Sequence, residues 1–243
     1  MDRGHPRGAD QAISSDAVDL TEALTAAPYP GRGLAIVRCG NGALGVVYWL
    51  TGRSTPSRER VLRASGPDLF VQDRRRGQAS DPLRHYRASR QVHGYDLVGN
   101  GDHVDHLAAA LEQRAGAIAA WWAEQPEPDA PLHTARLLGV VERTSETVYL
   151  AAVRRGTADV AEHVGLRVAE LPPGRGLAMA TYRGDPGAPH VWAEPIWIEA
   201  AHALEDQLAA TWAALDPRFR VAAASRYLES DATWTMQAVD GAS

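Results

Sequence analysis

Residues 33–50 read GLAIVRCGNGALGVVYWL, and this stretch does most to decide the fold class. Two apolar runs, residues 33–39 and residues 44–50, flank a Gly-Asn-Gly sequence at positions 40–42. Asn-Gly between two apolar runs is a strong β-hairpin signal, because both residues tolerate the positive φ angles that tight hairpin turns require. The stretch therefore predicts two antiparallel strands joined by a short turn.

Strand-like pairs recur along the rest of the chain, whereas helical periodicity is confined to two segments. A short strand is expected at 69–71 within a loop-rich region from 65 to 89, with others at 95–98, 136–141, 147–154, 164–169, 176–182, 219–224 and 233–239. Apolar spacing predicts helices over 102–124, with Asp102 as a plausible N-cap, and over 198–214. The alternating strand–helix order of a parallel sheet is missing, so the pattern predicts an α+β fold with antiparallel sheets and helices packed outside.

Length and composition describe an ordinary globular protein. The chain has 243 residues, of which 45% are hydrophobic and 23% charged, and its net charge is −5. Because neither an internal repeat nor an interdomain linker is visible, we predict a single domain over residues 26–243, preceded by a flexible leader at 1–25. No apolar run reaches the roughly 18–20 residues of a membrane span. The polar start, residues 1–16, lacks the apolar core of a signal peptide, which favours a cytoplasmic protein.

The charged residues and the single cysteine exclude several classes of function. All 25 basic residues are arginine, so neither a lysine Schiff base nor a P-loop lysine is possible. Cys39 is the only cysteine, which excludes an internal disulfide and a multi-cysteine zinc site. The chain is mildly acidic without a sustained basic stripe, and the arginine run at 74–76 is interpreted as a solvated loop. We therefore expect no nucleic-acid partner.

A metal site is not expected either, although the start of one predicted helix offers ligand-type side chains. His103 and His106 are three residues apart, with Asp102 and Asp105 beside them. Helix capping and solvent exposure explain such a group more often than metal binding does. We expect neither a metal nor another cofactor.

Polar groups gather in four segments at the ends of predicted strands. These segments are 29–33, with Arg32; 53–58, with Arg53, Ser54, Ser57 and Arg58; 81–87; and 99–103. Guanidinium groups held at a strand end beside hydroxyl donors suit a bound phosphate or another oxyanion. Taken singly, each segment is more commonly a turn, a helix cap, a packing site or a solvated surface.

Taken together and in order, the segments resemble the archaeal-type inosine monophosphate (IMP) cyclohydrolase family. The matching motifs are Tyr-Pro-Gly-Arg at 29–32, Thr-Gly-Arg-Ser-Thr-Pro-Ser-Arg at 51–58, residues 81–87 with Tyr86, Gly-Asn-Gly-Asp-His at 99–103, residues 134–140, Leu-Pro-Pro-Gly at 171–174 and Ala-Thr-Tyr-Arg-Gly-Asp at 180–185. The resemblance covers residues 29–198.

The resemblance implies both a fold and an activity. The fold is like that of the N-terminal-nucleophile hydrolases, a four-layer αββα sandwich of antiparallel sheets, without self-processing. The activity is the last ring closure of purine synthesis, in which 5-formamidoimidazole-4-carboxamide ribotide loses water to form IMP. The partner is then a small nucleotide substrate, and a homo-oligomer is possible. Two alternatives stay open: related ring chemistry on a purine-like nucleotide in a specialised pathway, and a non-catalytic nucleotide-binding protein on the same scaffold.

The matched motifs also suggest which residues form the site. The expected catalytic residues are Tyr86, Arg53, Glu127 and Asn100, and the expected substrate-binding residues are Arg32, Arg58, Ser54 and His103. The arginines are expected to hold the 5′-phosphate. Tyr86 is expected to donate a hydrogen bond to the formyl oxygen as negative charge develops there, and Asn100 to orient the carboxamide.

The general base is the part of the family pattern that this chain changes most. The family carries a glutamate with a nearby lysine shortly before the segment matched at 134–140. Here the lysine is absent and the spacing differs, so Glu127 is the best candidate, with Glu124 and Asp129 behind it. His133 is a further candidate for proton transfer, since an imidazole titrates near neutral pH.

Overall fold

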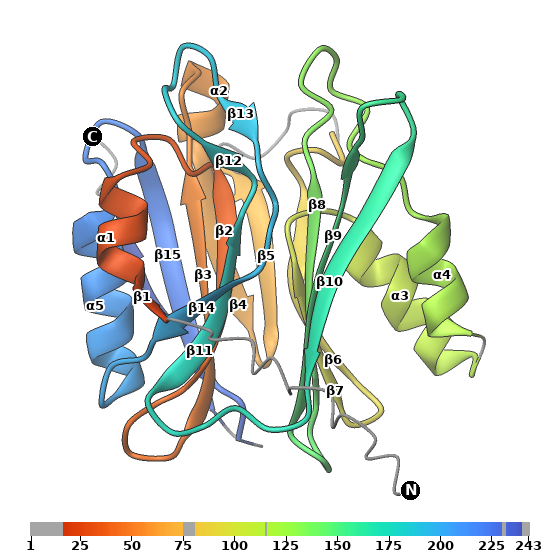
Figure 1. Ribbon diagram of the computed structural model, residues 1–243, viewed down its shortest axis with the longest axis vertical. Helices are drawn as coiled ribbons and strands as arrows, with labels where there is room; N and C mark the ends of the chain where they lie inside the picture. The colour runs from red at the N-terminus through yellow and green to blue at the C-terminus, as the bar shows by residue number, and fades with distance from the viewer. Residues whose placement is uncertain (1–16, 75–80, 115, 230–231, 240–243) are drawn as a thin grey trace, which may run out of the picture.

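Two β-sheets are stacked face to face, and helices cover their outer faces (Figure 1). The computed structural model describes residues 17–74, 81–114, 116–229 and 232–239. Within these residues, the first sheet has seven strands in the order β1 (Val18–Asp19), β14 (Ile196–Glu199), β11 (Arg175–Ala180), β2 (Arg32–Arg38), β3 (Leu44–Thr51), β15 (Arg220–Tyr227) and β16 (Thr235–Ala238). The second, also of seven, has the order β10 (Ala161–Val168), β9 (Thr147–Arg155), β8 (Arg136–Glu142), β7 (Tyr95–Gly99), β6 (Tyr86–Val92), β5 (Asp68–Asp73) and β4 (Arg60–Ser65).

Pairing in the described part of the chain is antiparallel except between β1 and β14, which are parallel. A short ribbon of β12 (Tyr182–Arg183) and β13 (His190–Val191) stands apart from the two large sheets. The expectation of an α+β fold with antiparallel sheets and outer helices is confirmed.

The β2–β3 hairpin forms as the sequence predicts. Its register runs from Arg32 opposite Leu50 to Arg38 opposite Leu44, and Gly42 in the turn has φ +90°. Every residue of both strands is buried, because one face packs against helices and the other against the second sheet. A strand buried on both faces reads as a continuous apolar run rather than an alternating one.

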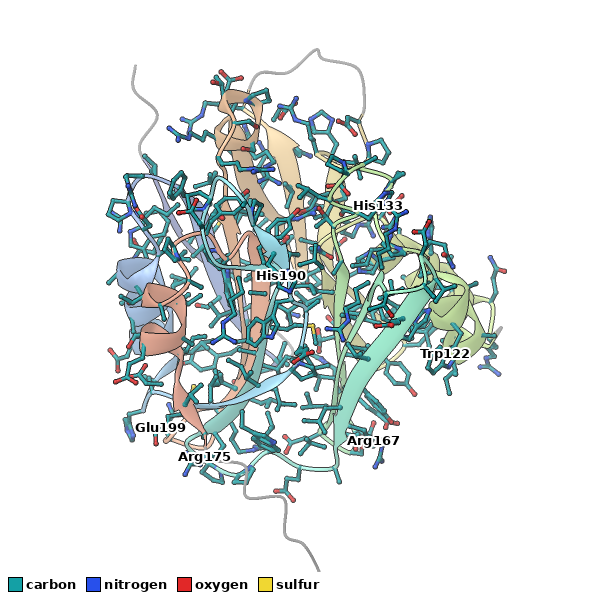
Figure 2. The ribbon with its side chains drawn as sticks, turned by 45° about the horizontal axis from the view of Figure 1, so that its top comes forward. Trp122, His133, Arg167, Arg175, His190 and Glu199 are labelled. Carbon is teal, nitrogen blue, oxygen red and sulfur yellow. The ribbon has the colours of Figure 1, made fainter. Side chains whose placement is uncertain are left out.

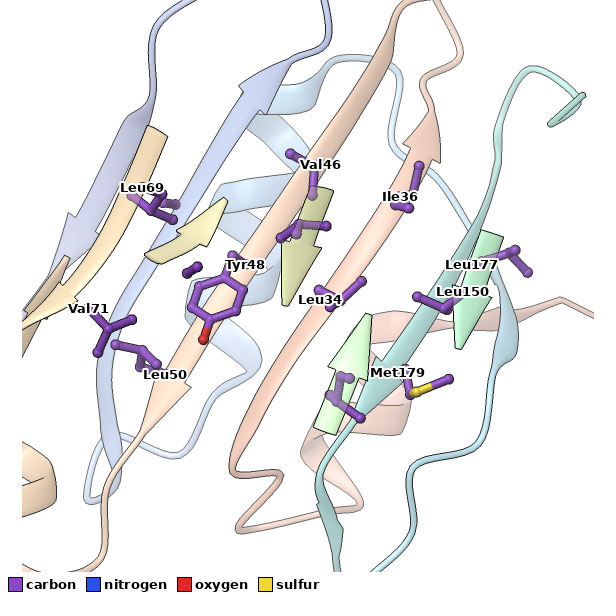
Figure 3. Close-up of a cluster of buried hydrophobic side chains, with 14 of the residues drawn as sticks. Leu34, Ile36, Val46, Tyr48, Leu50, Leu69, Val71, Leu150, Leu177 and Met179 are labelled. Atoms are coloured by element: carbon purple, nitrogen blue, oxygen red, sulfur yellow. The ribbon is translucent and has the colours of Figure 1, made fainter. Parts of the chain in front are cut away.

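Three apolar clusters hold the layers together. The largest lies between the two sheets, where Leu34 and Ile36 of β2 and Tyr48 of β3 meet side chains such as Leu150 of β9 (Figure 3). A second cluster joins the first sheet to α1 (Leu20–Thr25) and α5 (Leu204–Ala214), and a third joins the second sheet to α3 (His103–Glu112) and α4 (Ala117–Ala123). Each helical pair therefore covers the outer face of one sheet.

The start of the described chain corrects one prediction. Residues 18–25, assigned to a flexible leader, form β1 and α1 instead, and Leu20 and Leu24 are buried in the cluster beneath α5. These two leucines are four residues apart, so they lie on one face of the helix. The rest of the predicted leader, residues 1–16, lies outside the described residues.

Two predicted helices are shorter than expected. The helix predicted over 102–124 is divided into α3 and α4, and Arg114 between them has φ +51°, which a helix cannot continue. The helix predicted from 198 begins only at Leu204, because residues 196–199 form β14.

The loop-rich region predicted over 65–89 is also partly wrong. It contains all of β5, in which the strand predicted at 69–71 is confirmed, and also the start of β6, which was not predicted. Residues 75–80, which include two arginines of the 74–76 run, lie outside the described residues. Among the described residues, no helix combines the length and apolarity needed to cross a membrane.

Candidate active site

A cavity of about 260 Å³ is lined in part by residues of α2 (Thr55–Arg58) and β12. These two elements are labelled in the upper part of Figure 1. The cavity is lined by Tyr29, Gly31, Arg32, Thr51, Ser54, Pro56, Ser57, Arg60, Asp81, Leu83, Arg84, Glu127, Asp129, Thr134 and Tyr182. These residues come from five separate segments of the chain, each at or near the end of a strand. The cavity volume lies just below the roughly 300–1,000 Å³ typical of small-molecule pockets.

A buried ion pair forms one part of the cavity wall. Arg32, the first residue of β2, donates from Nη1 to Glu127 Oε1 at 2.9 Å and from Nη2 to Glu127 Oε2 at 2.6 Å. Burial acts to lower the pKa of Arg32, but the charge of Glu127 and the hydrogen bonds to it raise that pKa well above its ordinary value. Burial raises the pKa of Glu127, an effect that the Arg32 charge opposes. The pair is bidentate, the geometry in which arginine binds carboxylates best.

Asn100, which is not a lining residue, holds this pair in place through hydrogen bonds. Its backbone carbonyl accepts a hydrogen bond from Arg32 Nη1 at 2.8 Å. Its side-chain Nδ2 donates to the carbonyl of Ala135 at 2.8 Å, and its Oδ1 accepts from the backbone N–H of Leu137 at 2.7 Å. Asn100 is fully buried, so its amide joins the end of β7 to the start of β8.

Three polar side chains that line another part of the cavity are joined by hydrogen bonds. Tyr182 and Thr134 are joined through their hydroxyl groups, and Thr134 Oγ1 donates to Asp129 Oδ2 at 2.5 Å. Asp129 Oδ1 also accepts from the backbone N–H of Thr134 at 2.6 Å. Burial raises the pKa of Tyr182 to about 12, so its phenol is neutral near pH 7. Tyr29 stacks on Tyr182, with ring centroids 5.7 Å apart.

A further part of the lining is rich in arginine and serine. Ser54 caps α2 by accepting from the backbone N–H of Ser57 at 3.3 Å. Arg60 donates from Nε to the carbonyl of Ser57 at 3.0 Å and from Nη2 to that of Thr51 at 2.9 Å. Arg84 binds Asp73 Oδ1 at 2.5 Å through Nη2. The backbone and a buried carboxylate therefore hold two guanidinium groups beside two hydroxyls.

Of the residues predicted for the site, Arg32, Ser54 and Glu127 line the cavity. Arg53 and Arg58 are exposed beside it: Arg53 Nη1 donates to the carbonyl of Pro186 at 3.0 Å, and Arg58 Nε donates to that of Gly52 at 3.2 Å. The guanidinium of Arg53 also lies 5.9 Å from the ring centre of Tyr29, a lining residue.

Tyr86 and His103 are buried away from the lining. The hydroxyl of Tyr86 lies 2.9 Å from that of Tyr48, within the core between the sheets. His103 Nε2 lies 2.9 Å from the carbonyl of Leu137, and its Nδ1 lies 3.3 Å from Arg136 Nη1. Burial and the charge of Arg136 lower the pKa of His103 to about 3, so the imidazole is neutral and donates from Nε2.

The remaining candidates from the acidic stretch have other partners. Glu124 lies 2.9 Å from His106 Nδ1, so the two histidines considered for a metal face different neighbours. His133, labelled in Figure 2, has φ +47° and is not among the lining residues. Asp102 is the N-cap residue of α3, as the sequence predicted, but its side chain makes no capping hydrogen bond and pairs with Arg136 instead.

Sequence reasoning gave no role to several lining residues. Arg60 lies two residues beyond the 51–58 motif, Arg84 lies within the 81–87 segment, and Thr134 and Tyr182 lie within matched motifs. The sequence thus predicted which segments form the cavity. The order of the motifs does not show which side chain of a segment faces it.

Comparisons with known proteins agree with the segments that form the cavity. The model of a family described as IMP cyclohydrolase-like protein matches residues 29–232. An IMP cyclohydrolase of Thermococcus kodakarensis is 29% identical over 157 residues, which cover 63% of this chain and 73% of that protein. An IMP cyclohydrolase of Methanothrix thermoacetophila is 28% identical over 186 residues, which cover 72% of this chain and 81% of that protein.

Proposed function

The chain belongs to the IMP cyclohydrolase-like family, and on that basis we propose that it is a cyclohydrolase that closes 5-formamidoimidazole-4-carboxamide ribotide, with loss of water, to IMP. The observation that carries the proposal is the cavity. It gathers side chains from segments 29–33, 51–58 and 81–87, and from the acidic stretch before β8, into one wall. A polar cavity built from segments so distant in sequence is what a bound nucleotide requires.

The arginine-rich part of the cavity is the proposed phosphate site. Arg60 and Arg84 are already held by backbone carbonyls and by Asp73, so little side-chain entropy is lost when an anion binds. Ser54 contributes a hydroxyl, while Arg53 and Arg58 supply positive charge from the exposed rim. Charge-assisted hydrogen bonds from guanidinium groups to phosphate oxygens are among the stronger polar contacts in proteins.

Arg32 and Glu127 are proposed to act at the reacting end. Ring closure places negative charge on the formyl oxygen as the carboxamide nitrogen attacks the formyl carbon. A fixed guanidinium stabilises that charge without reorganising, and Glu127 fixes Arg32 through two hydrogen bonds. Asn100 is then a positioning residue, since it binds Arg32 through its carbonyl. In this arrangement Arg32 supplies the cation that lysine supplies in the family pattern.

Tyr86 and His103 are assigned supporting parts on the same reasoning. Tyr86 is hydrogen-bonded to Tyr48 in the core between the sheets, and His103 supports β8 through the carbonyl of Leu137. We also propose an N-terminal-nucleophile-hydrolase-like fold in one domain over residues 26–243, which the helix–sheet–sheet–helix order supports. A cytoplasmic location and a homo-oligomeric state stay predictions.

The test is an assay on purified protein with the formylated ribotide, in which IMP formation is followed by its absorbance. We expect turnover in the wild-type chain and none with Arg32→Met, while Arg63→Met, an exposed change on β4, keeps full activity. No turnover combined with stabilisation by IMP would favour a non-catalytic nucleotide-binding protein. If the protein shows no turnover and is not stabilised by IMP, both ribotide functions are refuted.

A further inference from the structure

The hydrogen bonds from Tyr182 to Asp129 have a direction. Thr134 carries one hydroxyl hydrogen, and an ionised carboxylate only accepts hydrogen bonds. Thr134 therefore donates to Asp129, and the bond between Tyr182 and Thr134 must be donated by Tyr182. Since Tyr182 lines the cavity, an oxygen lone pair on its hydroxyl is available to accept a proton there. The chain is ordered so that each hydroxyl can pass its proton toward Asp129.

The other carboxylates of the lining have different partners. Both oxygens of Glu127 already accept charge-assisted hydrogen bonds from Arg32. Asp81 Oδ1 accepts from the backbone N–H of Leu83 at 2.9 Å. Among the described lining residues, Asp129 is thus the carboxylate that is linked to Tyr182 through a hydroxyl group, that of Thr134.

We propose that Tyr182, Thr134 and Asp129 form the proton relay of this enzyme, with Asp129 as the base; this rests on the proposed ring closure. The bond between the carboxamide nitrogen and the formyl carbon forms as the carbonyl π electrons move to the formyl oxygen. The nitrogen's proton passes to Tyr182, the Tyr182 proton to Thr134, and the Thr134 proton to Asp129. Asp129 is neutral at the end of this step.

The second half of the reaction uses the same relay in both directions. Reversal returns the first proton to the formyl oxygen, which becomes a hydroxyl group. A second passage takes the proton from the formamido nitrogen, whose electron pair forms the new C=N bond. The returning proton leaves with the hydroxyl as water. One proton from each of the two nitrogens and the formyl oxygen leave as one water molecule, so no co-reactant is needed.

The central test removes one hydroxyl without changing the shape of the side chain. Thr134→Val deletes the middle of the relay, and we expect kcat to fall about 100-fold, the lower end of general acid–base effects. KM and the thermal shift caused by IMP should stay at wild-type values. Thr134→Ser, which keeps a hydroxyl, should recover most of the lost kcat. Tyr182→Phe interrupts the relay at the cavity end and should lower kcat similarly.

A variant at the proposed base separates a relay from a structural role. Asp129→Asn keeps the size of the side chain but lacks the carboxylate that takes up the proton, so kcat should fall as in Thr134→Val while KM stays at the wild-type value. Wild-type turnover with an unchanged kcat in both Thr134→Val and Tyr182→Phe would overturn the relay while leaving the ring closure in place. Absence of wild-type turnover would overturn the proposed function and, with it, the relay.

Discussion

Arg32 and Glu127 form a buried ion pair, although they are far apart in the sequence. They are 95 positions apart in sequence, and their side chains have exposed fractions of 9% and 2%. Sequence reasoning selected both, Arg32 for phosphate and Glu127 as a base, but could not pair them. The pair forms because β2 begins where the acidic stretch enters β8, a contact set by the stacking of two sheets.

Removing one partner of this ion pair should lower the free energy of unfolding more than removing both partners. Arg32→Met leaves a buried, unpaired carboxylate, and we expect the free energy of unfolding to fall by about 3–5 kcal/mol. Arg32→Met combined with Glu127→Leu leaves no buried charge, so the double variant should recover much of that stability. Urea unfolding of both variants, with Arg63→Met as the exposed control, measures the difference. Equal stability of the single and double variants would show that the pair is not coupled.

His103 predicts an acid-sensitive stability. Its folded-state pKa is about 3, because burial and Arg136 disfavour the imidazolium, whereas the unfolded chain titrates near the ordinary value of 6.5. Between these values only the unfolded state binds the proton, so stability falls as pH falls, by up to about 1.4 kcal/mol per pH unit. Denaturant titrations from pH 7 to pH 4 should show this slope in the wild-type chain.

The matched variants isolate the histidine that is responsible. His103→Gln removes the titrating group and should flatten the pH dependence by about one proton's slope. His190→Gln, which replaces an exposed histidine of β13 (Figure 2), is the control. If both variants keep the wild-type slope, the buried imidazole is not the source of the acid sensitivity.

At the scale of elements, local signals predict some features and fail at others for physical reasons. The β2–β3 hairpin was predictable because the Asn-Gly turn and both apolar runs point to one local structure. The division between α3 and α4 was not, because nothing in the residues near Arg114 requires its positive φ. Strand β4 was not predicted, because more buried and more exposed residues alternate over only its first part. Its partner β5 also lies in a polar region of the sequence.

Gly33 allows the β2–β3 hairpin to pack against a tryptophan. A Cβ at this position would lie 2.1 Å from an indole carbon of Trp49 and 2.8 Å from the carbonyl oxygen of Met179. Backbone on one side and a fully buried ring on the other leave little room to adjust. Gly33→Ala should therefore lower the free energy of unfolding by about 1–3 kcal/mol.

Gly116 offers the matched control for that substitution. The nearest atom to a Cβ there is the Ala119 Cβ at 3.6 Å, and its φ is ordinary. Gly116→Ala should change stability by less than about 1 kcal/mol. Chemical denaturation of both variants decides the comparison, and a Gly33→Ala protein as stable as the Gly116→Ala protein would contradict the packing argument.

At the scale of the whole molecule, the site is a product of topology. Segments from Tyr29 to Tyr182 meet because strands of both stacked sheets end beside α2 and β12. The order of motifs was enough to expect one pocket and to select Arg32, Ser54 and Glu127. It could not place Asn100 behind the wall or Tyr182 in it, because strand order and sheet stacking decide which residues face inward.

Binding of IMP should be visible in the stability of the entire fold, because a ligand that binds only the folded state stabilises it. At an IMP concentration of 100 Kd, the wild-type protein should gain about 2.7 kcal/mol. Arg60→Met removes one guanidinium from the proposed phosphate site. If affinity falls about 30-fold, the gain at the same IMP concentration should drop to about 1 kcal/mol. Inosine, which lacks the phosphate, should stabilise both proteins equally. Thermal unfolding with each ligand measures these gains, and comparing shifts within one variant cancels any change in its intrinsic stability. An Arg60→Met protein that keeps the full IMP gain would place the phosphate elsewhere in the cavity.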